Sequence, residues 1–251
     1  MMLGNFETRA EQSEQSKMST LFQRPDREEL PHLGEQMEAM KPESEVKSFD
    51  SRPGLEELPH LEEKDADEKS EKQIEEIQKA IKRIANGEEL TTAEKGNLCE
   101  MMMDQYYISK GYTPMHARVT SLEDKGHQGI DGVYEKDGKY VIVDAKYGTA
   151  QLGETQDGKQ MSAEWIDRRL DDAVGKENAD KIRDAYEDDP KNVLTEVYHF
   201  DPEPDANGNM HSDVYPVDEN GTKCGERNQV EAYDRDGTQI IREDDRGDDN
   251  A

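Results

Sequence analysis

The sequence predicts an α/β domain over residues 88–200, in the order helix, strand, strand, strand, helix, strand, with an antiparallel hairpin inside a mixed sheet. Three observations predict it. A capping box at Thr91–Glu94 opens a long apolar helical run. Two alternating apolar runs flank Asp137-Gly138, a strong signal for a hairpin. The helical pattern of residues 162–187 then leads into an apolar strand at Val193–Phe200.

The composition indicates that only part of the chain builds this domain. Hydrophobic residues make up 31% of the chain, charged residues 37%, and the formal net charge is −28. Low hydrophobicity with high net charge is typical of disordered segments. So acidic a chain is also not expected to hold nucleic acid by bulk electrostatics, because phosphates attract Lys and Arg patches. Any contact with nucleic acid would be local or assisted by a metal.

Residues 1–70 are predicted to be a disordered acidic arm, followed by an amphipathic helix over 71–87. Within the arm, RPDREELPHLGE at 24–35 recurs as RPGLEELPHLEE at 52–63. Two copies are too few for a solenoid. The repeat is therefore either an accidental duplication in a linker or a pair of short motifs that dock on a partner protein.

The helix that Thr91 caps should end at Gly111 and be largely buried, with Glu100 inside its apolar run. Residues 115–123 alternate weakly and predict a short strand. Residues 201–242 are expected to add a β-hairpin extension, and 243–251 to form a disordered acidic tail.

The two cysteines match no zinc-ligand spacing, and no run approaches the roughly 20 apolar residues of a membrane helix. The start of the chain lacks the apolar segment of a secretory signal. The expectation is a soluble protein, either cytoplasmic or delivered without a cleaved signal peptide, with no membrane contact.

A tight Asp137-Gly138 turn fixes the register of the hairpin. Lys136 then pairs with Lys139, and each step back along one strand is matched by a step forward along the other. This pairing sets Asp131 opposite Asp144. Side chains alternate along a strand, so Lys146 shares the face of Asp144, with Ile142 and Val133, while Ile130, Tyr134, Val141, Val143 and Ala145 take the other face.

Two like charges opposed across a hairpin destabilise it, since their Cβ atoms lie about 4.5–5.5 Å apart. One carboxyl group could stay protonated, Lys146 could compensate alone, or a divalent cation could bind both. A site with oxygen ligands and no cysteine favours Mg²⁺ or Mn²⁺ over zinc.

These residues resemble the PD-(D/E)xK nucleases, which share the restriction-endonuclease-like fold. The resemblance rests on Asp131, on Asp144-Ala145-Lys146 at the end of the next strand, and on the order of elements. It covers about 100 residues, and Ile130 stands where the nominal motif has proline. The stretch VIVDAKYGTAQLG with DGKQMS is also similar to nuclease domains of bacterial polymorphic toxins.

The resemblance implies a role for each matching residue. Asp131 and Asp144 would bind the metal with the Ala145 carbonyl, and Glu100 would complete the shell directly or through water. Lys146 would orient the attacking water or help to deprotonate it, and would offset the charge that develops on the phosphate. Gln160 would be the further polar residue that many members carry.

The implied function is a Mg²⁺- or Mn²⁺-dependent endonuclease acting on DNA rather than RNA, as a bacterial toxin or effector domain that an immunity protein could neutralise. Two other classes stay open. One is a catalytically idle nuclease fold that binds a protein partner, and the other is an acidic inhibitor that mimics nucleic acid. His127 is a further loop residue that could touch a phosphate, although a loop histidine is more often only solvated.

Overall fold

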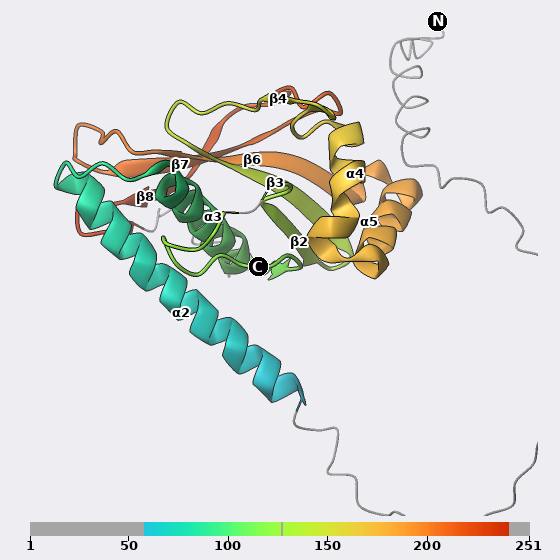
Figure 1. The fold of residues 1–251 in the computed structure, drawn as a ribbon, viewed down its shortest axis with the longest axis horizontal. Helices are drawn as coiled ribbons and strands as arrows, with labels where there is room; N and C mark the ends of the chain where they lie inside the picture. Colours follow the sequence, from blue (N-terminus) through green and yellow to red (C-terminus); the bar gives the residue numbers. More distant parts are fainter. Residues whose placement is uncertain (1–57, 127, 241–251) are drawn as a thin grey trace, which may run out of the picture.

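The computed structural model describes residues 58–126 and 128–240. Within them the chain forms an α/β fold around one mixed seven-stranded sheet, with the strand order β1-β2-β3-β6-β7-β8-β9 (Figure 1). The helices are α2 (Leu58–Ala85), α3 (Thr92–Ser109), α4 (Ala163–Val174), α5 (Lys176–Asp188) and the 3₁₀ turn η1 (Pro190–Asn192). The sheet strands are β1 (Thr113–Pro114), β2 (Gly132–Lys136), β3 (Lys139–Tyr147), β6 (Val193–Asp201), β7 (Met210–Pro216), β8 (Asn228–Tyr233) and β9 (Gln239–Ile240). A small separate ribbon pairs β4 (Glu154–Thr155) with β5 (Gly158–Lys159).

Helix α2 begins at Leu58, well before the predicted start at residue 71. The predicted boundary of the disordered arm at residue 70 is therefore too late in the chain. Its last residues, including the end of the second motif copy at 52–63, are helical. The first copy at 24–35 lies outside the described residues. The predicted end is confirmed, since the helix finishes at Ala85 and Gly87 takes a left-handed φ of 79°. None of the described helices has the length and apolarity needed to cross a membrane.

Helix α3 forms as its sequence predicts. The Thr91 side chain accepts a hydrogen bond from the Glu94 amide, and the Glu94 carboxylate accepts one from the Thr91 amide, which completes the capping box. The helix is largely buried through Leu98, Cys99, Met101, Met102, Met103 and Tyr107.

The predicted strand at 115–123 is wrong. Only Thr113–Pro114 pairs with β2, and the segment that follows is irregular. The Met115 amide still donates to the Val133 carbonyl of β2, but further along the amides of Thr120 and Ser121 donate to the Asp124 carboxylate. Such local bonds compete with a strand ladder.

The predicted hairpin register is confirmed. Lys136 pairs with Lys139, and Gly132 pairs with Val143. Asp137 and Gly138 have φ values of 52° and 73°, as a type I′ turn requires. Strand β3 then pairs in parallel with β6, which puts β3 in the middle of the sheet.

The C-terminal part extends the same sheet. Strands β7, β8 and β9 continue from β6 as an antiparallel meander, so residues 201–240 add three strands to the sheet where the sequence predicted one hairpin. Strand β8 is the element that the sequence pattern missed. The predicted tail at 243–251 lies outside the described residues.

Helices cover both faces of the sheet (Figure 1). Helices α2 and α3 pack on the face that carries Tyr134, Val141 and Val143, and α4 and α5 pack on the face that carries Val133 and Ile142. The predicted faces are confirmed for these residues. Ile130 is the exception: it packs with Val133 and Ile142, because it lies before β2 and outside the strand alternation.

Candidate functional site

Asp131 and Asp144 meet where the chain enters β2 and β3 nears its end. Asp131 lies one residue before β2, and its Oδ2 accepts a 2.9 Å hydrogen bond from the Ala145 amide. The hairpin register brings the two segments together, and this bond fixes the Asp131 carboxylate beside residues 144 and 145. Asp144 lies within β3 and is only 1% exposed.

Lys146 lies two residues beyond Asp144 on the same face, and its ammonium forms an ion pair with Oδ2 of Asp144. Both side chains are largely withdrawn from water, since 12% of the Lys146 side chain is exposed and the Asp144 carboxylate is buried. Salt screens a buried pair less than an exposed one. One ammonium faces two carboxylates here, so the group carries net negative charge when both acids are ionised.

The pKa values of both acids reflect this excess. Burial, together with the charges of Asp144 and Glu100, raises the pKa of Asp131 to about 8. Burial also raises the pKa of Asp144, although the nearby Lys146 ammonium opposes that shift. Two carboxyl groups that both resist ionisation indicate a site whose charge the chain itself does not balance.

Glu100 approaches from helix α3. Its charge raises the pKa of both Asp131 and Asp144, and also that of the buried thiol Cys99 beside it. No three Asp, Glu, His or Cys side chains in the described parts of the chain are grouped closely enough to hold a metal ion. In this conformation, therefore, Glu100 does not form a ready-made three-carboxylate shell with the two aspartates.

Gln160 follows the β4–β5 ribbon and has a local role. Its side-chain oxygen accepts a 2.8 Å hydrogen bond from the Gly153 amide, and its own amide donates to the Gly153 carbonyl. The described contacts of Gln160 tie that loop together and none of them joins it to Asp131 or Asp144. His127 lies outside the described residues.

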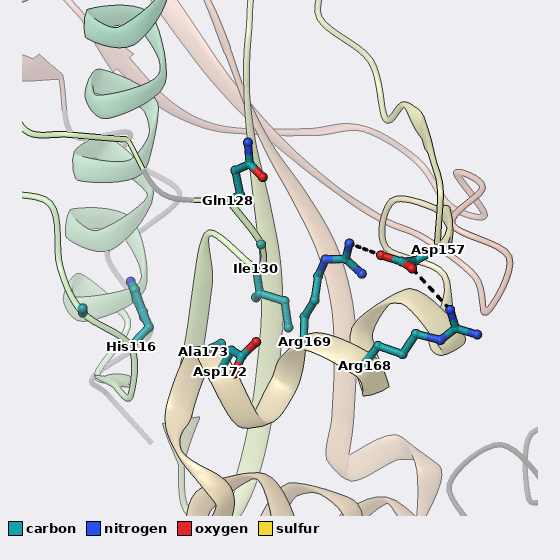
Figure 2. Close-up of a pocket in the computed structure, with 10 residues that line it drawn as sticks. His116, Gln128, Ile130, Asp157, Arg168, Arg169, Asp172 and Ala173 are labelled. Atoms are coloured by element: carbon teal, nitrogen blue, oxygen red, sulfur yellow. Dashed lines mark hydrogen bonds and ion pairs between the residues drawn. The ribbon is translucent and has the colours of Figure 1, made fainter.

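A cavity of about 590 Å³ lies beside the strand entry (Figure 2). Gln128, Gly129 and Ile130, which lead directly into Asp131, form one wall, and helix α4 forms the other. On that helix Arg168 and Arg169 both pair with Asp157, at 3.4 and 2.7 Å (Figure 2). Neither Asp131 nor Asp144 lines this cavity, and its two guanidinium groups are already engaged.

The sheet also brings together five residues that the sequence pattern did not single out. In the parallel β3–β6 pairing His199 lies beside Lys146, and in the β6–β7 pairing Asp213 lies beside His199. Two residues away on each of these strands, Asp144 on β3 pairs with Val197 on β6, and Val197 pairs with Tyr215 on β7. Arg227, just before β8, contacts both Asp213 and the Tyr215 ring. The only sequence signal is alternation within each strand, which does not reveal which strands are neighbours.

The donors at the acidic pair fit Mg²⁺ or Mn²⁺. They are carboxylate oxygens, and the two acids hold more negative charge than Lys146 offsets. Mg²⁺ in proteins is often bound by one or two carboxylates, with water and substrate phosphate completing the shell.

Comparisons of the chain with protein-family models, with curated proteins and with solved structures find no match.

Proposed function

We propose that this protein is a metal-dependent nuclease that hydrolyses phosphodiester bonds, with DNA as the preferred substrate, and that its core is a divergent restriction-endonuclease-like domain. The observation that carries the proposal is the convergence of Asp131, Asp144 and Lys146 where β2 begins and β3 nears its end. Burial raises the pKa of both carboxyl groups, and only one ammonium lies beside them. Such a group costs stability, which a strand with a purely structural role would not need to lose.

In this proposal Asp131 and Asp144 hold the cation, and the Ala145 carbonyl adds a neutral oxygen. The Ala145 amide keeps the Asp131 carboxylate in place before the cation arrives, which lowers the entropic cost of binding. A bound Mg²⁺ or Mn²⁺ would supply a water of lowered pKa and would offset charge at the scissile phosphate.

Lys146 has a separate role. Its ammonium lies at Asp144 and carries three N–H donors, so it can hold Asp144 and still donate to a phosphate oxygen or to the attacking water. Charge that develops on the phosphate during attack is then met by a fixed cation in a site with little water. Glu100, whose charge reaches both aspartates, would act through a water molecule.

The test is plasmid cleavage with Mg²⁺ or Mn²⁺, combined with calorimetric metal titration. Asp144→Asn and Lys146→Met remove one charge each with little change of shape. Asp180→Asn and Lys181→Met are matched controls, because both residues lie on α5 and pair only with neighbours along that helix.

We expect cleavage by the wild type and both controls, and a loss of about 10²-fold or more in each site variant. Metal affinity should fall in Asp144→Asn and change less in Lys146→Met. The nuclease assignment is wrong if the wild type neither cleaves DNA or RNA nor binds the metal, or if both site variants cleave as the wild type does.

A further inference from the structure

Beyond the acidic pair, the same face of the sheet carries a second group of polar residues. Lys146, His199 and Asp213 lie side by side on β3, β6 and β7, and Asp144, Val197 and Tyr215 form the row next to them. Paired residues on neighbouring strands point to the same face. The site therefore continues across three strands, toward the loop that joins β7 to β8.

That loop carries two exposed basic residues, Lys223 and Arg227, next to Tyr215. The Lys223 ammonium and the Arg227 guanidinium both lie 5.3 Å from the centre of the Tyr215 ring. The ring itself is 5% exposed, so it forms a platform beneath them. Cation–π contact at such distances limits where each cation can lie. A backbone bond from the Cys224 amide to the Pro216 carbonyl holds the loop against the end of β7.

Arg227 is held from a second side. Its Nη1 lies 3.4 Å from Oδ2 of Asp213, and the same oxygen lies 3.9 Å from Nδ1 of His199. His199 is 3% exposed, its Nε2 bonds to the Gly148 carbonyl, and its Nδ1 has no hydrogen-bond partner. The buried imidazole thus faces Asp213, and Asp213 fixes the guanidinium.

Lys223 differs from the arginines of the nearby helices α4 and α5 in its ion pairing. Ion pairs engage Arg168, Arg169 and Arg183 on the neighbouring helices. Among the described residues no carboxylate lies within ion-pair distance of Lys223, or of Lys159, which bonds to the Thr222 hydroxyl at 3.1 Å. In a chain of net charge −28, the Lys223 ammonium, which no described carboxylate neutralises, and the Arg227 guanidinium beside it give this spot a local positive charge that an anion can use.

We propose that Lys223 and Arg227 bind backbone phosphates of the substrate strand and position that strand along β7 and β6 against Asp144 and Lys146. The proposal rests on the proposed nuclease function and adds to it the residues that hold the substrate. It also explains how so acidic a protein could engage nucleic acid: the contact is a short row of cations beside the acidic pair. His199 and Asp213 are positioning residues, since they act through Arg227.

The test measures binding of the full-length chain to a fluorescent DNA oligonucleotide, by anisotropy in EDTA, across a series of salt concentrations. An RNA of the same sequence forms a second arm. The variants are Lys223→Gln, Arg227→Gln and the double variant. Lys176→Gln and Lys181→Gln serve as controls, because both are exposed lysines on α5, away from the row. Thermal unfolding checks that each variant is folded.

Lys223→Gln and Arg227→Gln should each bind the oligonucleotide roughly threefold more weakly than the wild type at low salt, and the double variant about tenfold more weakly. The slope of log affinity against log salt should fall by about one for each cation removed, a change that a purely structural role would not produce. The controls should match the wild type. A further expected result is a raised KM with kcat nearly unchanged in the double variant.

The two proposals fail in different ways. If Asp144→Asn abolishes cleavage while the double variant keeps wild-type affinity and salt slope, the row has no role in binding and the nuclease function stands. If the double variant loses affinity but the wild type cleaves no substrate, the row binds phosphates and the nuclease function is wrong. If the folded wild type binds neither DNA nor RNA, the proposal for the row is overturned.

Discussion

The backbone amide of Ala145 donates a 2.9 Å hydrogen bond to the Asp131 carboxylate. The bond joins the residue before β2 to a residue near the end of β3, and it places Asp131 next to Asp144 within a buried group. The Asp131 carboxylate therefore takes part in the hydrogen bonding of the hairpin, and a change in either strand should alter the position of the acidic pair.

The raised pKa of Asp131 should appear in the pH dependence of stability. A carboxyl group with a folded-state pKa of about 8 and an ordinary value of 3.8 keeps its proton longer in the folded state. Its contribution to stability is complete below pH 4 and is lost as the pH rises toward 8. We expect the denaturant midpoint in EDTA to fall over this range, by less in Asp131→Asn, which should be roughly 1–2 kcal/mol more stable than the wild type at pH 8.

Divalent metal should reverse that loss. A cation that binds only the folded state stabilises it by mass action, and it should bind more tightly as Asp131 loses its proton between pH 6 and 8. The measurement is the melting temperature with and without Mg²⁺ or Mn²⁺ at several pH values. An equal metal-induced rise in wild type and Asp131→Asn would contradict the metal assignment.

Gly132 should be essential for the position of Asp131. A Cβ at this position would lie 2.7 Å from Cε of Met103 and 2.8 Å from the Tyr134 ring. Gly132→Ala is therefore expected to shift the start of β2, to cost about 1–3 kcal/mol of stability and to lower cleavage. Gly96→Ala is the matched control, because a Cβ there meets nothing within 4 Å and the residue is helical. It should stabilise the protein by about 0.4–1 kcal/mol, and equal destabilisation by both changes would refute the packing argument.

The buried Asp104 should hold helix α2 to the rest of the fold. Its carboxylate accepts 2.7 Å hydrogen bonds from Gln73 on α2 and from Tyr134 on β2, and it pairs with Arg118 at 3.2 Å. Asp104→Ala would leave the Arg118 charge without this partner in a buried setting, at a cost of about 3–5 kcal/mol. Chemical denaturation measures this, and Asp65→Ala, at an exposed pair on α2, is the control that should change little.

The two thiols should differ in reactivity. Cys99 is fully buried, and burial raises its pKa, with the charges of Glu100 and Asp131 acting in the same direction. Cys224 is exposed. A disulfide reagent should therefore modify one thiol in the native protein and the second only on unfolding. Cys224→Ser should remove the fast phase, and a fast phase that persists in this variant would place Cys99 at the surface.

Local signals were enough for several elements. The capping box at Thr91 and Glu94 set the start of α3, because both bonds close within one turn. The Asp137-Gly138 turn set the register of β2 and β3, because a two-residue turn allows a single pairing. From that register alone the sequence placed Asp131, Asp144 and Lys146 together.

Tertiary structure decided the rest. The segment 115–123 looked like a strand, yet the Asp124 carboxylate binds the amides of Thr120 and Ser121, and the His116 side chain accepts from the Val133 amide where a strand would pair. The start of α2 at Leu58 could not be read from a polar stretch with little periodicity. Which strands flank β3 was also undetermined, because no short turn links β3 to β6 and packing of α4 and α5 selects the parallel pairing.

The sequence by itself therefore determined the acidic pair and its lysine, since these lie on one hairpin whose turn is encoded locally. Only the tertiary structure brought His199, Asp213 and Arg227 together, and only the tertiary structure created the burial that is the main cause of the raised pKa of Asp131. The physical reason is the same in both cases: pairing across a crossover and loss of water depend on contacts between segments far apart in the chain, and no local pattern specifies them.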